Sequence, residues 1–266
     1  MRSRAELTLE QAAGQLGWSI TKVSRIETAR VGVTTSDLKL MLDLYGVAGE
    51  RRHAMIALGR TARTRGWWDA YADSLPERHV SYIALEFETS AIRSYRAQVV
   101  PGLFQTGEYA REIIGAALLG RIAPAEVERR VEARLTRQRL LTRDENPVRL
   151  WTVIDEAALR RRIGSPEVMR RQRERLLAVA VLPNVTVQVL PVSAGAHPAT
   201  AGSFSILQFP GHDPDVACAE IMTDTVYVED DAEVYQYSLA FDRLCAIALS
   251  PEESGAFVAR VAGQDF

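Results

Sequence analysis

Twenty residues near the N-terminus, LEQAAGQLGWSITKVSRIET, constrain the fold of this chain more than any other stretch. The stretch holds two short helical patterns, joined by a glycine that adopts a left-handed turn at little cost. Small residues stand where the two helices meet, and apolar residues recur on the inner face of each helix. The anchors of this pattern are Ala13, Gly17, Trp18, Val23 and Ile26. The stretch therefore predicts a helix-turn-helix.

The second helix of this stretch carries its polar side chains opposite its apolar seam. Ser19 is placed to cap the helix. Ile20, Val23 and Ile26 are spaced to face inward, which leaves Thr21, Lys22, Ser24, Arg25 and Thr28 pointing outward. Short hydroxyls and long cations on such a helix are typical of a recognition helix in the major groove of DNA. A solvated amphipathic helix would show a similar outer face, but the ordered anchors favour DNA binding.

Charge is divided unequally along the chain, whose net charge is −2. Residues 1–65 hold 11 Lys or Arg against 6 Asp or Glu, a balance of +5, which leaves −7 for the rest. A polyanionic partner is expected to bind the N-terminal part. The alternative is that charge simply varies along solvated helices. Two tryptophans, a proline and mixed charge then mark a change of composition. We predict a helix-turn-helix domain over residues 1–66, a linker over 67–80 and a second domain over 81–266.

The two predicted domains differ in fold class. The first is expected to be all-α, with helical patterns over residues 8–16, 19–29, 34–46 and 48–66 and candidate N-caps at Thr8, Ser19 and Thr34 or Thr35. The second mixes amphipathic helices with strand patterns over residues 92–100, 148–156, 184–192, 202–209, 216–222 and 225–230. Because helices precede a run of consecutive strands, we expect an α+β domain with a largely antiparallel sheet backed by helices.

Two parts of the chain resemble known families. Residues 8–45, and GWSITKVSRIETAR and TTSDLKLMLDLYGV above all, resemble the Xre or lambda-repressor-like (Cro/CI-type) helix-turn-helix regulators. A C-terminal domain of unknown function, common in regulators of high-GC Gram-positive bacteria, is similar to the stretches IRSYRAQVVPGLFQTGEYAR, LPNVTVQVLPVSAGAH and LSPEES. Together the resemblances cover nearly the whole chain. They imply a transcriptional regulator, and an antitoxin-like arrangement in which a small partner protein binds it.

The resemblance assigns roles along the second helix. Its first recognition positions fall at Ile20, Thr21 and Lys22. Contacts to base edges are expected from Thr21, Lys22 and Arg25. Phosphate or flanking contacts, which fix register and add salt-dependent affinity, are expected from Ser19, Ser24, Thr28 and Arg30. Because one such helix contacts few base pairs, we expect a homodimer on double-stranded DNA.

Three features depart from the family pattern. Leu9 stands where a polar residue that touches phosphate usually opens the first helix. Ala29 replaces the usual glycine after the second helix, so Gly32 is a candidate for closing that turn. The helix that normally precedes the motif is reduced to MRSRAEL. Either the start of translation lies upstream, or the domain is less stable because the core beneath Val23 and Ile26 is less covered.

Other clusters carry weaker signals, and we expect no catalytic residues, no metal and no cofactor. His212, Asp213 and Asp215 stand close together, but the proline and glycine among them indicate a surface turn. The acidic run at residues 229–231 precedes a helical pattern and suits the positive end of that helix. Nucleophile-elbow, P-loop and dinucleotide-binding patterns are all missing from the sequence, so an enzyme is not expected.

Three features of the second domain leave alternatives open. His197 is either a plain loop residue or part of a ligand pocket. Val187, Phe204 and Tyr227 either belong to the core or line a ligand pocket among the strands. A run of arginines is either a solvated or acid-paired helix face or a second nucleic-acid surface; it comprises Arg129, Arg130, Arg134, Arg137 and Arg139.

We expect neither a leader peptide nor a membrane-spanning segment. MRSRAELTLEQ lacks the apolar centre of a signal peptide, and no apolar run approaches roughly 18 residues. Cys218 and Cys245, which lack CxxC spacing, are expected to be buried free thiols. We therefore expect a cytoplasmic protein, found at the nucleoid when bound to DNA. The rival function is an interaction protein that binds a small partner or ligand through its C-terminal domain, with DNA binding only autoregulatory.

Overall fold

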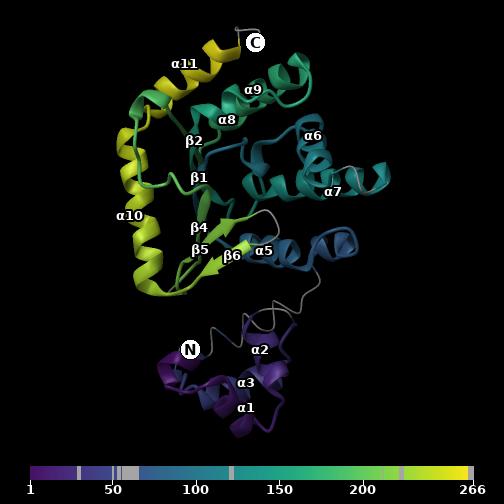
Figure 1. Cartoon of the computed structure of the whole chain (residues 1–266), viewed down its shortest axis with the longest axis vertical. Helices are drawn as coiled ribbons and strands as arrows, with labels where there is room; N and C mark the ends of the chain where they lie inside the picture. The colour runs from purple at the N-terminus through teal and green to yellow at the C-terminus, as the bar shows by residue number, and fades with distance from the viewer. Residues whose placement is uncertain are drawn as a thin grey trace. The chain divides into compact units, whose positions relative to one another are not determined.

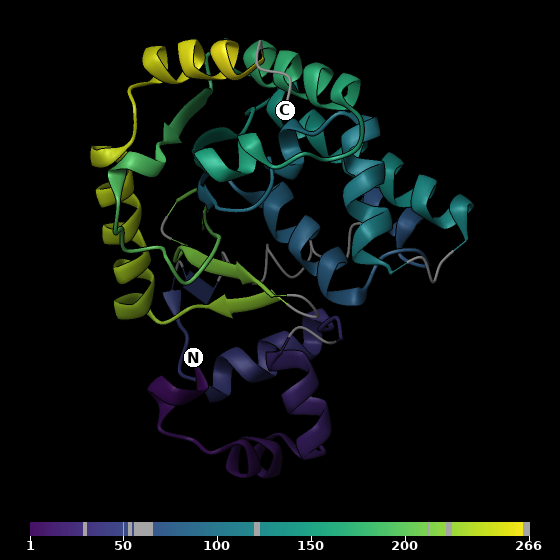
Figure 2. The same cartoon turned by 45° about the horizontal axis from the view of Figure 1, so that its top comes forward.

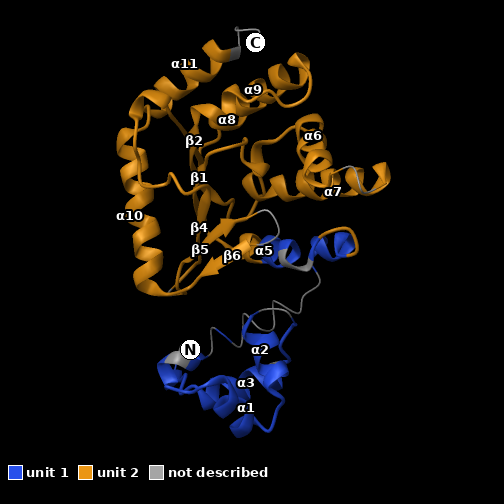
Figure 3. Ribbon diagram, viewed as in Figure 1, with its two compact units in different colours: residues 1–72, 76–84 blue, residues 73–75, 85–266 orange. Residues whose placement is uncertain are grey.

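The fold of the chain is seen in a computed structural model (Figure 1). The residues described are 1–28, 31–49, 51–52, 55, 66–119, 123–211, 213–221 and 225–262. The chain divides into two compact units, residues 1–72 with 76–84 and residues 73–75 with 85–266 (Figure 3). Each unit has a hydrophobic core of its own.

The N-terminal unit is built from short helices. Those whose bounds fall within the described residues are η1 (Arg2–Ala5), α1 (Leu9–Leu16), α2 (Ile20–Glu27), α3 (Thr35–Leu44), η2 (Trp67–Tyr71) and α5 (Glu77–Glu88), the last of which runs on into the second unit. Ala12, Ala13 and Val23 form the buried core, and Leu9 and Trp18 pack against it. The all-α prediction for this part is confirmed, although the helix predicted over residues 48–66 falls largely outside the described residues.

Side-chain caps begin α1, α2 and α3, as predicted. The Thr8 hydroxyl accepts a hydrogen bond from the Gln11 amide at 3.2 Å, and the Gln11 side chain accepts one from the Thr8 amide at 2.8 Å. Ser19 and Thr34 cap α2 and α3, each accepting a bond from the third amide of its helix. These bonds satisfy backbone donors that the start of a helix leaves without partners.

The C-terminal unit contains a six-stranded sheet and the helices that cover it. Its strands are β1 (Ala91–Arg96), β2 (Arg149–Asp155), β3 (Val185–Leu190), β4 (Phe204–Gln208), β5 (Val216–Glu220) and β6 (Thr225–Val228). Its helices are η3 (Gly102–Phe104), α6 (Gly107–Ala117), α7 (Pro124–Arg137), η4 (Gln138–Leu141), α8 (Glu156–Arg160), α9 (Pro166–Ala180), η5 (Val192–Ala194), α10 (Asp231–Ile247) and α11 (Pro251–Ala262).

The strands lie in the order β3-β2-β1-β4-β5-β6. β4 pairs antiparallel with β1 and β5, and β5 pairs antiparallel with β6, which confirms an α+β unit with a largely antiparallel sheet. β1, β2 and β3 run parallel to one another, which the sequence reading did not predict. The parallel half arises because α6 and α7, and then α8 and α9, carry the chain back between successive strands.

The two faces of the sheet meet different helices. α10 lies along one face, and α6 and α7 lie beyond the other (Figures 1 and 2). On the α10 side, Tyr95 of β1 and Phe204 of β4 pack with Phe241 in the main core of the unit. Because side chains alternate along a strand, Ser94 and Arg96 of β1 point to the opposite face, toward α7.

Candidate nucleic-acid interface

The turn between α1 and α2 has the geometry that a helix-turn-helix requires. Gly17 has φ 67° and ψ 28°, in the left-handed region that favours glycine. Its amide donates to the Gly14 carbonyl at 3.3 Å, and the Trp18 amide donates to the Ala13 carbonyl at 2.9 Å. These bonds close the end of α1, and the contact of Ala13 with Val23 in the core then holds α2 against it.

The inner face of α2 is narrower than the sequence indicates. Val23 is fully buried and Ile26 is half-buried. Ile20, which was predicted to face inward, exposes 46% of its surface, so that prediction is wrong. Three residues advance a helix by about 300°, so Ile20 and Ile26 flank Val23 on opposite sides instead of lying in line with it. Ile20 therefore adds an apolar group to the outer face.

Two of the three predicted base-contacting residues stand open on α2. Thr21 and Arg25 are exposed, and within the described part of the chain neither side chain has a hydrogen bond or an ion pair. They are four residues apart, which places them on neighbouring turns of one helix face. This pair offers one hydroxyl and one guanidinium fork to a partner.

Lys22 is in a different position from Thr21 and Arg25. Its ammonium lies 3.2 Å from the Asp37 carboxylate on α3 and 3.8 Å above the centre of the Trp18 ring. The side chain is 40% exposed, so the contact is partly screened by water. Lys22 thus joins α2 to α3, and its charge already has a partner. Sequence reading missed Asp37 because the two residues are fifteen positions apart.

The predicted phosphate-contacting residues are partly used by the helix itself. The Ser19 hydroxyl caps α2, and the Thr28 hydroxyl donates to the Ser24 carbonyl at 2.7 Å. Ser24 is half-buried, whereas Ser19 and Thr28 are exposed at the two ends of α2. Arg30 lies outside the described residues.

Glu27, the last residue of α2, is held by two segments that sequence reading did not connect to it. Arg2 of η1 donates to its carboxylate at 3.0 and 3.1 Å, and the Tyr45 hydroxyl donates to it at 2.8 Å. Burial, helped by this carboxylate, raises the pKa of Tyr45 above its ordinary value. Arg2 also donates to the Leu7 carbonyl at 2.8 Å. The short N-terminal turn therefore fastens the far end of the candidate recognition helix.

Two departures from the helix-turn-helix family that the sequence resembles are accommodated locally. Leu9 packs against the core of Ala12 and Val23, so it supports the fold of the unit at the position where the family usually carries a polar residue. The end of α2 is closed by the Val31 amide, which donates to the Arg25 carbonyl at 3.2 Å. Ala29, where the family usually has glycine, lies outside the described residues.

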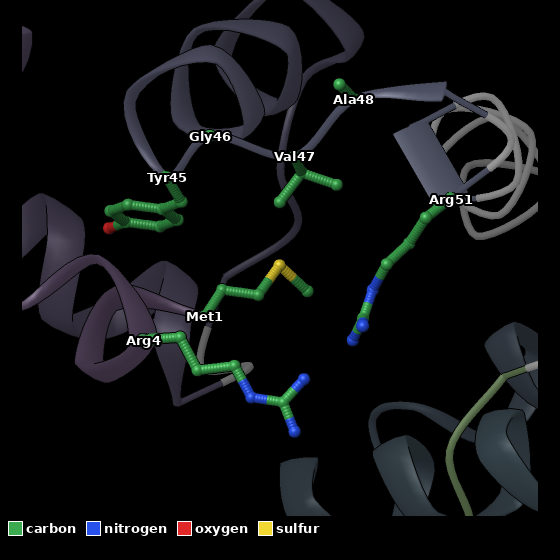
Figure 4. Close-up of a pocket in the computed structure, with 7 residues that line it drawn as sticks. All are labelled: Met1, Arg4, Tyr45, Gly46, Val47, Ala48 and Arg51. Atoms are coloured by element: carbon green, nitrogen blue, oxygen red, sulfur yellow. The ribbon is translucent and has the colours of Figure 1, made fainter.

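A pocket of about 360 Å³ lies in the N-terminal unit. It is lined by Met1, Arg4, Tyr45, Gly46, Val47, Ala48 and Arg51. The guanidinium groups of Arg4 and Arg51 reach into this space, with the side chains of Met1 and Val47 beside them (Figure 4). None of the predicted DNA-contacting residues lines the pocket, so it is separate from the outer face of α2.

The acidic clusters of the C-terminal unit have structural roles. Asp230 caps α10 as its position predicts, accepting hydrogen bonds from the amides of Ala232 and Glu233 at 3.0 and 3.2 Å. Asp215 accepts a bond from the Gln208 side chain at 3.0 Å. His212 lies outside the described residues, and within those residues no three histidine, cysteine or acidic side chains gather as metal ligands would.

His197 belongs to a polar cluster at the carboxyl ends of β1 and β2. Its ring packs edge-on against Tyr95 with centroids 5.4 Å apart, and Nε2 lies 3.5 Å from the Tyr95 hydroxyl. That hydroxyl donates to Asp155 at 2.9 Å. Burial and the carboxylate raise the pKa of Tyr95 above its ordinary value. His197 is thus a loop residue whose ring packs against a side chain near the end of β1.

The residues proposed as an alternative ligand pocket do not meet. Phe204 aligns with Tyr95 and packs on Tyr237 of α10, with ring centroids 5.2 Å apart. Val187 and Tyr227 occupy the alternate strand positions, which point to the other face of the sheet. The hypothesis of a pocket formed by all three is therefore wrong.

The arginines of α7 are turned partly into the protein. Arg130 pairs with Glu126 at 3.1 Å, and Arg137 forms a buried ion pair with Glu86 of α5. Arg134 donates to the side chain of Gln105 at 2.8 Å. For Arg130 and Arg137 these contacts favour the acid-paired interpretation of the run over a second nucleic-acid surface.

The thiols are free, with Cys218 buried and Cys245 half-buried. Burial raises the pKa of each to about 12. Among the helices of the described residues, none combines the length and apolar character needed to cross a membrane.

Comparison with known families agrees with this division of the chain. The family described as "Domain of unknown function (DUF5753)" matches residues 80–260, more than half of the chain. The chain belongs to the DUF5753 family. A second family, described as "Helix-turn-helix domain", matches residues 1–55, which include α1, α2 and α3. This DUF5753 protein therefore has a helix-turn-helix domain ahead of its family domain. No curated protein and no solved structure matches the chain significantly.

Proposed function

We propose that this protein is a sequence-specific DNA-binding transcriptional regulator of the Xre or lambda-repressor-like class, and not an enzyme. The observation that carries the proposal is the outer face of α2, where Thr21 and Arg25 stand exposed on a helix anchored by Val23. A guanidinium can donate two hydrogen bonds to guanine, and a hydroxyl can serve several bases. Such a protein would act at the nucleoid.

Two further residues refine the expected contacts. Ile20 exposes its side chain beside Thr21, and an apolar group in the major groove suits the methyl group of thymine. Lys22 already contacts Asp37, so Arg25 is the stronger candidate for reading sequence. Ser19 and Thr28, at the two ends of α2, suit phosphate contacts that fix the register of the helix.

A dimer is the form in which this helix would work. An eight-residue helix covers too few base pairs for useful specificity, whereas two copies on half-sites about 34 Å apart read twice as many. The DUF5753 domain is the natural source of the dimer contacts, because it is the larger of the two units.

A second candidate function is binding of a small partner protein by the DUF5753 domain, with DNA binding autoregulatory. The charge of the chain favours it, because residues after 65 carry a balance of −7 while the N-terminal part carries +5. An acidic unit is poorly suited to DNA and better suited to a protein partner.

Fluorescence anisotropy with the DNA upstream of the protein's own gene and a scrambled duplex, at two salt concentrations, tests the main proposal. Arg25→Ala is expected to weaken binding to the native duplex by about 1–3 kcal/mol and binding to the scrambled duplex far less. Lys39→Ala, which removes an exposed cation from α3, is the matched control and leaves the preference intact. Equal affinity of the unaltered protein for both duplexes would contradict the proposal that it recognises a specific DNA sequence.

A further inference from the structure

Three arginines gather on the sheet face opposite α10, at the point where β1 ends. Arg96 is the last residue of β1, and Arg134 and Arg137 extend from α7. They are close enough that the charges of Arg137 and Arg96 act on Arg134 and help to lower its pKa. So many like charges in one place need negative partners.

Two of the three arginines have carboxylate partners. Arg137 binds both oxygens of Glu86, and both side chains are buried. Arg96 donates to Glu220 at 3.1 Å and to the Ser205 hydroxyl at 2.8 Å. Each of these two charges is therefore compensated directly by an acid.

Arg134 differs because its partner is neutral. It donates one hydrogen bond, to the amide oxygen of Gln105 at 2.8 Å, and within the described residues it makes no ion pair. Gln105 is itself buried and donates to the Val100 carbonyl at 2.8 Å, so the guanidinium is held in a fixed direction. Burial is the main reason that the pKa of Arg134 falls to about 10, and the group is still charged at neutral pH.

The position of this group in the sheet is one that ligands favour. β1 runs parallel to β2 on one side and antiparallel to β4 on the other, so the carboxyl ends of β1 and β2 lie at the same edge of the sheet as the amino end of β4. In open α/β sheets, ligands commonly bind outside the carboxyl ends of the parallel strands. Arg96 stands at that end of β1, Gln105 lies on the segment that follows it, and Arg134 reaches Gln105 from α7.

We propose that Arg134, oriented by Gln105 and assisted by Arg96, binds a small oxyanion at the carboxyl end of β1. The N–H groups of Arg134 that Gln105 does not use form a fork that matches the oxygens of a phosphoryl or carboxylate group. The anion would supply a negative charge in direct contact with Arg134, since Glu220, the carboxylate that acts on Arg134 electrostatically, is hydrogen-bonded to Arg96 instead. The proposal concerns the DUF5753 domain alone and does not depend on DNA binding.

Thermal unfolding of the full chain in inorganic phosphate and, separately, in acetate tests the proposal, with sodium chloride keeping ionic strength constant. We expect a saturable rise in Tm with at least one of the two anions, and the responding anion identifies the source as phosphoryl or carboxylate. Arg134→Gln should raise the half-saturating concentration at least about tenfold. Arg139→Gln, which removes an exposed arginine five positions away, is the matched control and keeps the response.

Two more variants keep the proposal testable if Arg134→Gln fails to fold. Arg134→Lys keeps the charge without the fork, so we expect a response weaker than that of the unaltered protein. Gln105→Glu places a carboxylate beside Arg134, which should occupy the guanidinium and abolish the response. The same change removes the hydrogen bond that the Gln105 side chain donates to the Val100 carbonyl. Absence of a saturable response to both anions, or a response of Arg134→Gln equal to that of the unaltered protein, would overturn the proposal.

Discussion

Single residues on α2 differ in whether their charge is already in use. The Lys22 ammonium lies between the Asp37 carboxylate and the Trp18 ring. Arg25, one turn away on the exposed side, makes no side-chain ion pair within the described residues. A cation that binds within the protein stabilises the unit, whereas a free one is available to a partner. Lys22 therefore contributes to the packing of α2 on α3, and we propose Arg25 for recognition.

This assignment predicts a measurable coupling between Lys22 and Asp37. Lys22→Ala should lower the free energy of unfolding by about 1 kcal/mol, because the ion pair is partly exposed and the ring contact is modest. Urea unfolding of both single alanine variants and of the double variant gives the coupling energy, expected at about 0.5–1 kcal/mol. Zero coupling, with a loss of DNA affinity as large as that of Arg25→Ala, would instead make Lys22 a DNA contact.

At the scale of the element, the α1–α2 unit depends on one left-handed residue. Gly17 ends α1 with φ 67°, whereas Gly14 lies inside α1. A Cβ built at either glycine meets no atom within 4 Å of it. The two positions therefore differ in backbone conformation and not in available space.

Alanine at these two glycines should act in opposite directions. Gly17→Ala should destabilise the unit by about 1–2 kcal/mol, because an L-residue is strained in the left-handed region. Gly14→Ala should stabilise it by about 0.5–1 kcal/mol, because alanine loses less backbone freedom in a helix. Denaturant unfolding of the two variants measures both effects. Equal effects of the same sign would show that the turn is not held in the left-handed region.

At the scale of the whole molecule, both cysteines and most of the buried apolar residues lie in the C-terminal unit. Cys218 is on β5, a strand of the sheet, and Cys245 is on α10, which packs against the sheet. Their raised pKa values follow from this burial, since a thiolate is poorly solvated inside the protein. The two thiols therefore link the stability of this unit to pH in the alkaline range.

The thiols predict a loss of stability in alkali. An exposed thiol ionises near pH 8.5, whereas the folded thiols keep their protons until about pH 12. Between these values only the unfolded chain loses protons, so unfolding becomes more favourable as pH rises. We expect Tm to fall steadily above about pH 9. A Cys218→Ala, Cys245→Ala double variant should show a shallower fall, and an identical slope would contradict this origin.

Local patterns in the sequence determined much of this fold. Helix caps at Thr8, Ser19 and Thr34 act over three or four residues, so they can be recognised in the sequence alone. The helix-turn-helix and all six strands were predictable for the same reason, because each depends on spacing within a short segment. The outward positions of Thr21 and Arg25 also followed from helical periodicity.

Only the tertiary structure decided which distant residues meet. Lys22 with Asp37, Arg137 with Glu86, and the parallel pairing of β1 with β2 join positions from fifteen to more than fifty residues apart. No local period encodes such contacts, because they depend on how whole elements pack. The exposure of Ile20 belongs here too, since Ile20 and Ile26 flank Val23 and packing covers Ile26 more than Ile20. The sequence by itself therefore determined the elements and the outer face of α2, and packing determined which of its cations remain available.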